Sequence, residues 1–308
     1  MRSAWVVLTG PVCSCIQLYT GLFFVAIFIA ILRRRQPEIP QPAITPPPPA
    51  TVPETSPPSS QQDDIAIDYH VPRLPYNEDT IVALISDIYH IYLQLNYIDP
   101  SEFVWAPLPD GHAINQTLCE ELHLDPAVIS LMKRLPYPLT PNLADDIPFM
   151  PLSRMFVYLQ DDQIRAGRDP DRWGFEEPRL DFLLPHEIAL CCETDQGIHI
   201  ILDTKENTIR VWDFDDPPPE DDNGNDYRKL YPHHAPTYLA SYINKLHSLE
   251  IIPIHWRGHR GLWDKHYTGM YPKIKKTLQE QYGWPYDFRE AEWKAASKDT
   301  FEQLIHFG

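Results

Sequence analysis

The feature that most constrains the fold is a stretch of three closely spaced apolar runs at residues 188–192, 198–202 and 208–214. The third run is rich in β-branched and aromatic residues, which favour strands. Residues 204–207 separate the last two runs, and Asn207 tolerates the left-handed conformation of a tight turn. The pattern predicts an antiparallel meander. Because the middle run is apolar on both faces, we expect it to lie inside a layered domain.

Helix signals surround this meander. Asn77 is a good N-cap for a helix that ends near residue 96, and Asp125 followed by Pro126 is typical of a helix start. Other segments are assigned by composition and spacing: helices at 116–122, from Pro236, at 270–282 and at 288–305, a strand at 154–160, a polar loop at 161–179 and a short apolar segment at 251–254. The predicted fold class is α+β, with a central antiparallel or mixed sheet near residues 186–214 flanked by helices.

The N-terminus carries a membrane signal. Residues 15–32 contain no charged side chain, and a helix of that length nearly spans a bilayer. Three arginines at 33–35 follow directly, against Arg2 alone on the other side, so the positive-inside rule predicts a single-pass anchor with the bulk of the chain in the cytoplasm. A cleaved signal peptide and a misassigned start codon are the alternatives.

Differences in composition separate a proline-rich segment from the rest of the chain. Residues 37–68 are rich in proline and lack the apolar content for a core, which predicts a disordered linker of extended conformation. It serves as a spacer or as a ligand for a proline-reading module. The predicted domains are therefore a membrane anchor at 1–36, this linker at 37–68 and an α+β domain at 69–308, with helical extensions at both of its ends.

The net charge indicates the class of partner, and the cysteine positions indicate the state of the thiols. The net charge is −17, and residues 1–36 hold four arginines and no acid, so the remainder is more acidic still. Such a surface repels nucleic acid and favours basic partners. Cys119, Cys191 and Cys192 fit no disulfide framework or zinc motif, so we expect reduced, mostly buried thiols.

No residue is assigned a catalytic, cofactor-binding or metal-binding role, and no cofactor or small-molecule substrate is predicted. The Asp221–Gly224 segment resembles part of an EF-hand, but the register places Pro219 and Leu230 at ligand positions that require carboxylates. No Gly-x-Ser-x-Gly motif and no glycine-rich phosphate loop occurs in the sequence. His186 with Glu187, and His233 with His234, are adjacent pairs without a recognisable partner.

The segment from His255 to Lys276 is the most suggestive. It contains His255, His259 and His266, six Lys or Arg residues, and the single acid Asp264. Two histidines four positions apart can hold a metal on a helix, but Gly258 and Gly261 disfavour a helix there. This basic strip is suited to a phosphate or an acidic partner, or to the acidic loop of the same chain at 213–226.

The meander resembles the SMI1/KNR4, or SUKH, superfamily. The similarity lies in residues 197–203, the turn through Asn207 and residues 209–211, with residues 183–185 and the helix at 238–246 as further support. Asn207 takes the place of the usual glycine, and the surrounding prolines and tryptophans resemble an uncharacterised fungal branch. The resemblance implies an α+β domain and a non-enzymatic binding module. Members of that superfamily regulate cell-wall synthesis and signalling in fungi and act as toxin-immunity proteins in bacteria.

These observations lead to one main hypothesis and two alternatives. The main hypothesis is a membrane-tethered, non-enzymatic protein-interaction and regulatory module, which predicts an apolar or charged surface patch. The first alternative is a hydrolase or metal-dependent enzyme that uses the histidines of residues 233–266 together with a carboxylate in one cleft. The second is a secreted or lumenal domain with a glycan on Asn115.

Overall fold

The structure is a computed structural model that describes residues 74–172, 177–194, 196–218, 220–221, 224–267 and 269–306. The chain divides after residue 66 into two units, and the description concerns the second, residues 67–308. The predicted linker at 37–68 lies outside the described residues.

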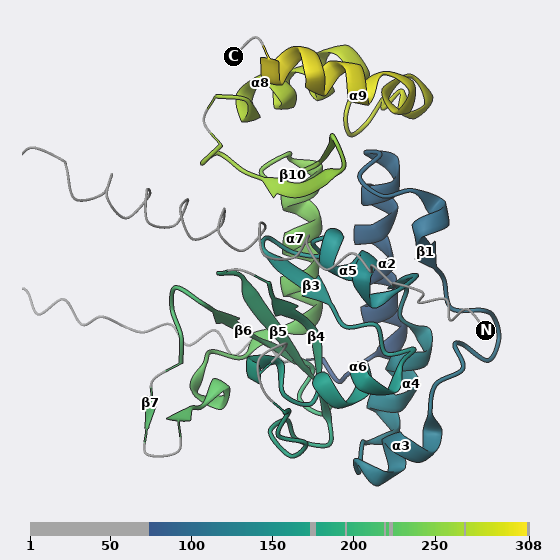
Figure 1. Ribbon diagram of the computed structural model, residues 1–308, viewed down its shortest axis with the longest axis vertical. Helices are drawn as coiled ribbons and strands as arrows, with labels where there is room; N and C mark the ends of the chain where they lie inside the picture. Colours follow the sequence, from purple (N-terminus) through teal and green to yellow (C-terminus); the bar gives the residue numbers. More distant parts are fainter. Residues whose placement is uncertain are drawn as a thin grey trace, which may run out of the picture. The chain divides into compact units, whose positions relative to one another are not determined.

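A five-stranded antiparallel sheet forms the centre of the described unit (Figure 1). In spatial order its strands are β3 (Ser153–Met155), β4 (Glu187–Glu193), β5 (Ile198–Asp203), β6 (Thr208–Asp213) and β9 (His233–His234). β4, β5 and β6 are the predicted meander, and Asn207 takes the left-handed conformation with φ +54°. Ile200, Ile201 and Leu202 are all buried, so β5 is covered on both faces as expected. The predicted α+β class with a sheet flanked by helices is confirmed.

Helical segments precede the sheet in the chain, lie between its strands and follow it. They are α2 (Glu78–Gln94), α3 (Gln116–Glu121), α4 (Pro126–Arg134), α5 (Pro141–Asp146), α6 (Asp161–Ala166) and α7 (Ala235–His247), with 3₁₀ turns at η1 (Pro100–Glu102), η2 (Pro170–Arg172) and η3 (Tyr227–Lys229). The Asn77 side chain accepts a hydrogen bond from the Thr80 backbone N–H at 2.9 Å, which is the predicted N-cap of α2. Two two-stranded ladders join β1 (Phe103–Val104) to β2 (Tyr137–Pro138) and β7 (Glu220–Asp221) to β8 (Gly224–Asn225).

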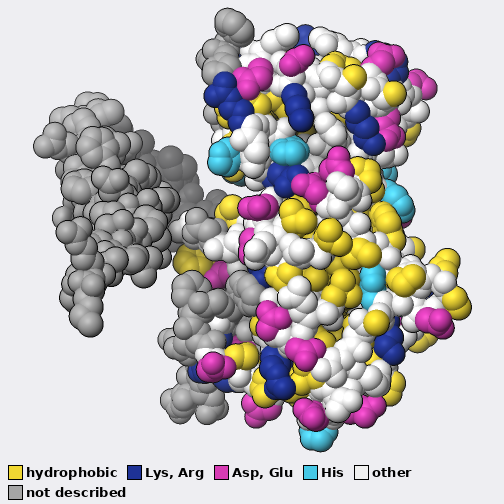
Figure 2. Space-filling view, turned by 45° about the vertical axis from the view of Figure 1, so that its right-hand side comes forward, with side chains coloured by type: hydrophobic (Ala, Val, Ile, Leu, Met, Phe, Trp, Pro, Cys, Tyr) yellow, Lys and Arg dark blue, Asp and Glu magenta, His cyan; other side chains and the backbone are white. Residues whose placement is uncertain are grey.

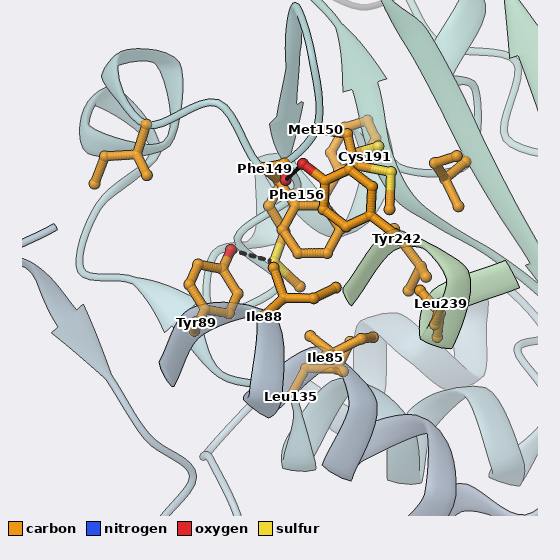
Figure 3. Packing of buried hydrophobic residues seen from close by; sticks show 14 of the residues in the cluster. Ile85, Ile88, Tyr89, Leu135, Phe149, Met150, Phe156, Cys191, Leu239 and Tyr242 are labelled. Carbon is orange, nitrogen blue, oxygen red and sulfur yellow. Dashed lines mark hydrogen bonds between the residues drawn. The ribbon is translucent and has the colours of Figure 1, made fainter. Parts of the chain in front are cut away.

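The main core lies between one face of the sheet and the neighbouring helices α2 and α7 (Figure 3). Ile85, Ile88 and Tyr89 reach it from α2, whereas Leu239 and Tyr242 reach it from α7. Hydroxyl groups inside this core are satisfied: Tyr89 donates to the Met155 sulfur at 3.0 Å, and Tyr242 donates to the Phe149 carbonyl at 3.4 Å. Tyr89 and Tyr242 therefore add apolar area to the core while their hydroxyl groups remain hydrogen-bonded.

The C-terminal part contains a hairpin and a helical cap. The hairpin pairs β10 (Ile252–Trp256) with β11 (His259–Trp263), and the cap consists of α8 (Tyr271–Lys276), the π-helix η4 (Thr277–Gln281) and α9 (Glu290–His306). Trp293 of α9 is fully buried, and its indole N–H donates to the Leu95 carbonyl at 2.8 Å. This contact ties α9 to the end of α2, so the cap belongs to the same unit as the sheet.

Two local predictions were wrong. The strand predicted at 154–160 ends at Met155, and the segment predicted as a loop at 161–179 contains α6 and η2. The apolar segment at 251–254 begins β10, so the two histidines four positions apart, His255 and His259, lie on paired strands and not on a helix.

The prediction of a single-pass membrane protein with a cytoplasmic domain requires correction. Among the described residues, no helix combines the length and the apolar character needed to cross a bilayer. The anchor itself was predicted from residues 15–32, which lie outside the described residues. The membrane localisation is therefore withdrawn.

Candidate functional site

The face of the sheet opposite the main core carries buried polar and charged side chains. Alternation along β5 and β6 directs His199, Asp203, Arg210 and Trp212 to this face. Phe182 and η3 cover part of it, since the Phe182 ring lies 6.4 Å from the Trp212 ring and 5.3 Å from the Tyr227 ring. Charged groups in such a layer require partners, and those partners determine the shape of the segment above them.

Arg168 organises the loop at residues 180–187. Its side chain is buried, and Nη1 donates to the Glu187 carbonyl at 2.9 Å. Nη2 donates to the Leu184 carbonyl at 3.0 Å and also to the Leu183 carbonyl. Burial lowers the pKa of this guanidinium, which is nevertheless held by three carbonyl oxygens. One cation therefore holds three backbone carbonyls of the loop, those of Leu183, Leu184 and Glu187.

Glu187 completes the same arrangement from β4. Its buried carboxylate accepts hydrogen bonds from the Leu184 backbone N–H at 2.8 Å and from the Tyr227 hydroxyl. Burial, followed by the nearby Glu187 charge, raises the pKa of Tyr227, so that hydroxyl stays protonated and donates. Arg210 Nη1 lies 3.8 Å from the second carboxylate oxygen of Glu187. We call Arg168, Glu187, Arg210 and Tyr227 the buried network.

An apolar hollow of about 320 Å³ opens on the outer side of this loop. It is lined by Glu121, Leu122, His123, Arg168, Leu180, Asp181, Leu183, Leu184 and Pro185. We call it the leucine groove. Its walls come from the end of α3 and from the loop that the buried network holds, and the Asp125 backbone N–H joins them by donating to the Pro185 carbonyl at 2.9 Å.

The leucine groove combines an aliphatic floor with a polar rim, on which Glu121 and Asp181 lie beside His123. Leu180 and Leu184 are each 39% exposed, which is unusual for leucines held in a rigid wall. Glu121 and Asp181 are exposed, and the described residues supply neither carboxylate with an ion-pair partner. The groove is therefore suited to an apolar side chain that lies next to a cation.

A second apolar surface flanks the β1–β2 ladder. Trp105 follows β1, Leu139 follows β2, and Leu108 lies in the adjoining loop with 94% of its surface exposed. The Trp105 ring stacks on the His90 ring of α2 at 4.7 Å. Figure 2 shows hydrophobic side chains gathered over the middle of one face, below an upper part on which charges of both signs are mixed. The apolar surface formed by Trp105, Leu108 and Leu139 is a second candidate contact face besides the leucine groove.

The histidines of residues 233–266 lie on separate elements. His233 and His234 form the edge strand β9, and His234 Nδ1 lies 2.8 Å from the Thr237 hydroxyl. His255 lies on β10 and His259 on β11. Within the described part of the chain, no three His, Cys, Asp or Glu side chains are grouped to hold a metal ion.

The two arginines of the basic strip pair with carboxylates outside the acidic loop at 213–226. Arg257 pairs with Glu302 at 2.7 Å, and Arg260 pairs with Glu102 at 2.6 Å. One partner belongs to α9 and the other to η1, so the sequence-based expectation named the wrong partner for these two residues. The calcium-like segment contributes only the β7–β8 ladder to the described structure.

The predicted burial of the cysteines is confirmed. Cys119, Cys191 and Cys192 are free and buried, and burial raises the pKa of each thiol.

Asn115, the residue of the glycosylation sequon, forms hydrogen bonds through both the oxygen and the nitrogen of its side-chain amide. Its oxygen caps α3 at Leu118 N, 3.0 Å away, and its Nδ2 donates to Asp161 at 2.8 Å.

Arg168, Tyr227 and Leu180 were not singled out from the sequence, and Leu184 was noted only within residues 183–185 of the family resemblance. Each belongs to a loop or a 3₁₀ turn without periodicity, and their partners lie tens of residues away in the chain. Glu187 and His186 were noted as a pair, but their contacts depend on the tertiary fold: His186 Nε2 lies 3.8 Å from Asp203. No local sequence pattern predicts the tertiary contacts of Arg168, Glu187, Tyr227 and His186.

Comparison with known proteins adds no relative: no family model, no curated protein and no solved structure matches this chain. The resemblance to the SMI1/KNR4 superfamily therefore stays a prediction.

Proposed function

We propose that this protein is a non-enzymatic protein-interaction module, and that the leucine groove is its docking site. The occupant is a segment of a partner protein that presents an aliphatic side chain next to a lysine or arginine. The observation that carries the proposal is the combination of two half-exposed leucines with two unpaired carboxylates around one hollow. A regulatory role of the kind found in the SMI1/KNR4 superfamily is consistent with such a module.

The buried network supports this proposal because it makes the groove rigid. Binding a flexible loop costs entropy, whereas a wall fixed by Arg168 and Glu187 presents its leucines in one arrangement before the partner arrives. The net charge of −17 supports it as well, since a negative surface accelerates the approach of a basic segment.

Selection of peptides from a random display library on the full chain tests the proposal. We expect enrichment of peptides with an aliphatic residue beside Lys or Arg. Leu184→Asp should reduce binding of the selected peptides by about tenfold or more, because a carboxylate on the groove floor must be desolvated when the peptide docks. Tyr286→Asp is the neutral control, since Tyr286 is 95% exposed and far from the loop in sequence.

Leu108→Asp separates the two apolar surfaces. If Leu108→Asp abolishes binding and Leu184→Asp does not, the docking site is the surface beside β1 and β2, and the groove assignment is wrong. If the selected peptides bind Leu184→Asp as tightly as the unaltered chain and carry no cationic residue, the groove proposal fails. Circular dichroism of each variant confirms that these exposed substitutions leave the fold intact.

A further inference from the structure

A second hollow of about 380 Å³ lies where the tip of the β10–β11 hairpin faces α9. His255, Trp256, Arg257, Gly258, Lys298 and Glu302 line it. A Cβ built on Gly258 would meet no atom within 4 Å, so the hollow is open to solvent beside the turn. Its side chains are cationic and aromatic, in contrast to the aliphatic and acidic leucine groove.

The turn at the hairpin tip holds an arginine in an unfavourable conformation. Arg257 has φ +52° and Gly258 has φ +78°, and Trp256 pairs with His259 across them, which defines a two-residue turn with both central residues left-handed. Asparagine, aspartate or glycine is preferred at the first of these positions. A side chain other than these costs roughly 1 kcal/mol there, so Arg257 adds backbone strain to the turn.

The Arg257 side chain is fixed at the wall of the hollow. Its Nε and Nη2 donate to the two carboxylate oxygens of Glu302 at 2.7 and 3.0 Å. The guanidinium also lies 4.8 Å above the Trp256 ring. A two-pronged ion pair and a ring contact hold this group in one orientation, and Glu302 neutralises its charge.

The positive charge in the hollow that no carboxylate neutralises is that of Lys298, and His255 lies beside it on the wall. In the described structure, Lys298 has no carboxylate within 4 Å and His255 has no hydrogen-bond partner. Burial lowers the pKa of His255, and the charges of Arg260 on β11 and Lys298 on α9 lower it further, while Glu102 on η1 opposes them. Arg260 is neutralised by Glu102, its neighbour at 2.6 Å. An anion placed between Lys298 and His255 would relieve this repulsion.

We propose that this hollow binds a phosphate monoester, with Lys298 and His255 contacting the phosphate oxygens and Trp256 facing the organic part. A dianion can accept from an ammonium and an imidazolium together. The volume exceeds that needed for a phosphate group alone and falls in the range of small-molecule sites, which favours an ester over the free ion. The site is separate from the leucine groove, so the outcome of its test is independent of the peptide-binding proposal.

Histidine-selective NMR of the full chain tests the site, with the His255 resonance identified by its loss in His255→Gln. Addition of inorganic phosphate, AMP or adenosine is compared with chloride at equal ionic strength, which controls for screening. We expect phosphate and AMP to raise the pKa of His255 by about one unit, because a bound anion stabilises the imidazolium. AMP should bind more tightly than phosphate, and adenosine should leave the pKa unchanged.

A lysine pair provides the matched control. Lys298→Ala should weaken the binding of AMP by about tenfold, the usual loss for one charge-assisted contact. Lys273→Ala removes the same charge from an exposed position of α8 outside the hollow and should change affinity less than about twofold. The proposal is overturned if chloride shifts His255 as much as phosphate does, or if the two lysine variants lose affinity equally. An adenosine effect equal to that of AMP would show that the hollow recognises the base and not the phosphate.

Discussion

His199 shows how far a single residue departs from its solution behaviour in this fold. It lies on β5 with 3% of its surface exposed, and its ring is 5.0 Å from the Trp212 ring. Burial lowers the pKa of His199 to about 4, and the charge of Asp169 offsets only part of that effect. The imidazole is therefore neutral in the folded protein at neutral pH.

This burial predicts a pH dependence of stability. Between about pH 6.5 and about pH 4, the unfolded chain takes up a proton at His199 that the folded chain does not. The free energy of unfolding therefore falls as the pH falls through this window, by on the order of 3 kcal/mol in total. Urea unfolding at about pH 7.5 and about pH 4.5 measures the change.

The variant His199→Phe isolates this contribution from that of the many carboxylates. Phenylalanine fills a similar space beside Trp212 and cannot titrate, so the stability of the variant should depend less steeply on pH in this window, whatever its stability at neutral pH. Equal pH dependence of the two proteins would show that His199 titrates normally in the folded state.

At the scale of elements, the β5–β6 turn joins the sheet to the start of the described unit. Asp203 Oδ1 accepts from the backbone N–H groups of Lys205 and Glu206 at 2.8 and 2.9 Å. Asn207 Nδ2 donates to the Leu74 carbonyl at 2.9 Å, so this side chain has a tertiary role that glycine lacks. Asparagine at this position therefore serves both the turn and the packing of the chain before α2.

Substitution of Asn207 separates these two roles. Asn207→Gly keeps the left-handed turn but loses the contact with Leu74, which should cost about 1 kcal/mol. Asn207→Ala loses the same contact and adds the strain of a Cβ at φ +54°, so it should be less stable than Asn207→Gly by about another 1 kcal/mol. Thermal and urea unfolding of both variants measure the difference. An alanine variant as stable as the glycine variant would mean that the turn does not require the left-handed conformation.

The sequence predicted elements well where periodicity or capping specified them, and poorly where tertiary contacts did. The β4–β6 meander, α2, α4 and α7 carry alternation, caps or an apolar stripe. The residues that follow β3 are buried but form no further strand: the Phe156 N–H donates to the Leu190 carbonyl and the Tyr158 hydroxyl donates to the Ala189 carbonyl. α6 has six residues and no stripe, so its helical form depends on its environment.

The same division applies to the whole molecule. The prediction of basic partners came from the net charge, which depends on composition alone. The leucine groove was not predicted, because Glu121 and Leu184 approach one another only through the loop that Arg168 and Glu187 hold. Long-range pairing between charged residues leaves no periodic signal in a single sequence.

The measurement that tests the account most directly is peptide selection on the double variant Glu121→Lys/Asp181→Lys beside selection on the unaltered chain. Both carboxylates are exposed at the rim, so the variant should keep its fold, as circular dichroism verifies. The account predicts that both selections retain an aliphatic anchor while the charge beside it changes from basic on the unaltered chain to acidic on the variant. Peptides of the same charge from both selections, or no enrichment on the unaltered chain, would contradict it.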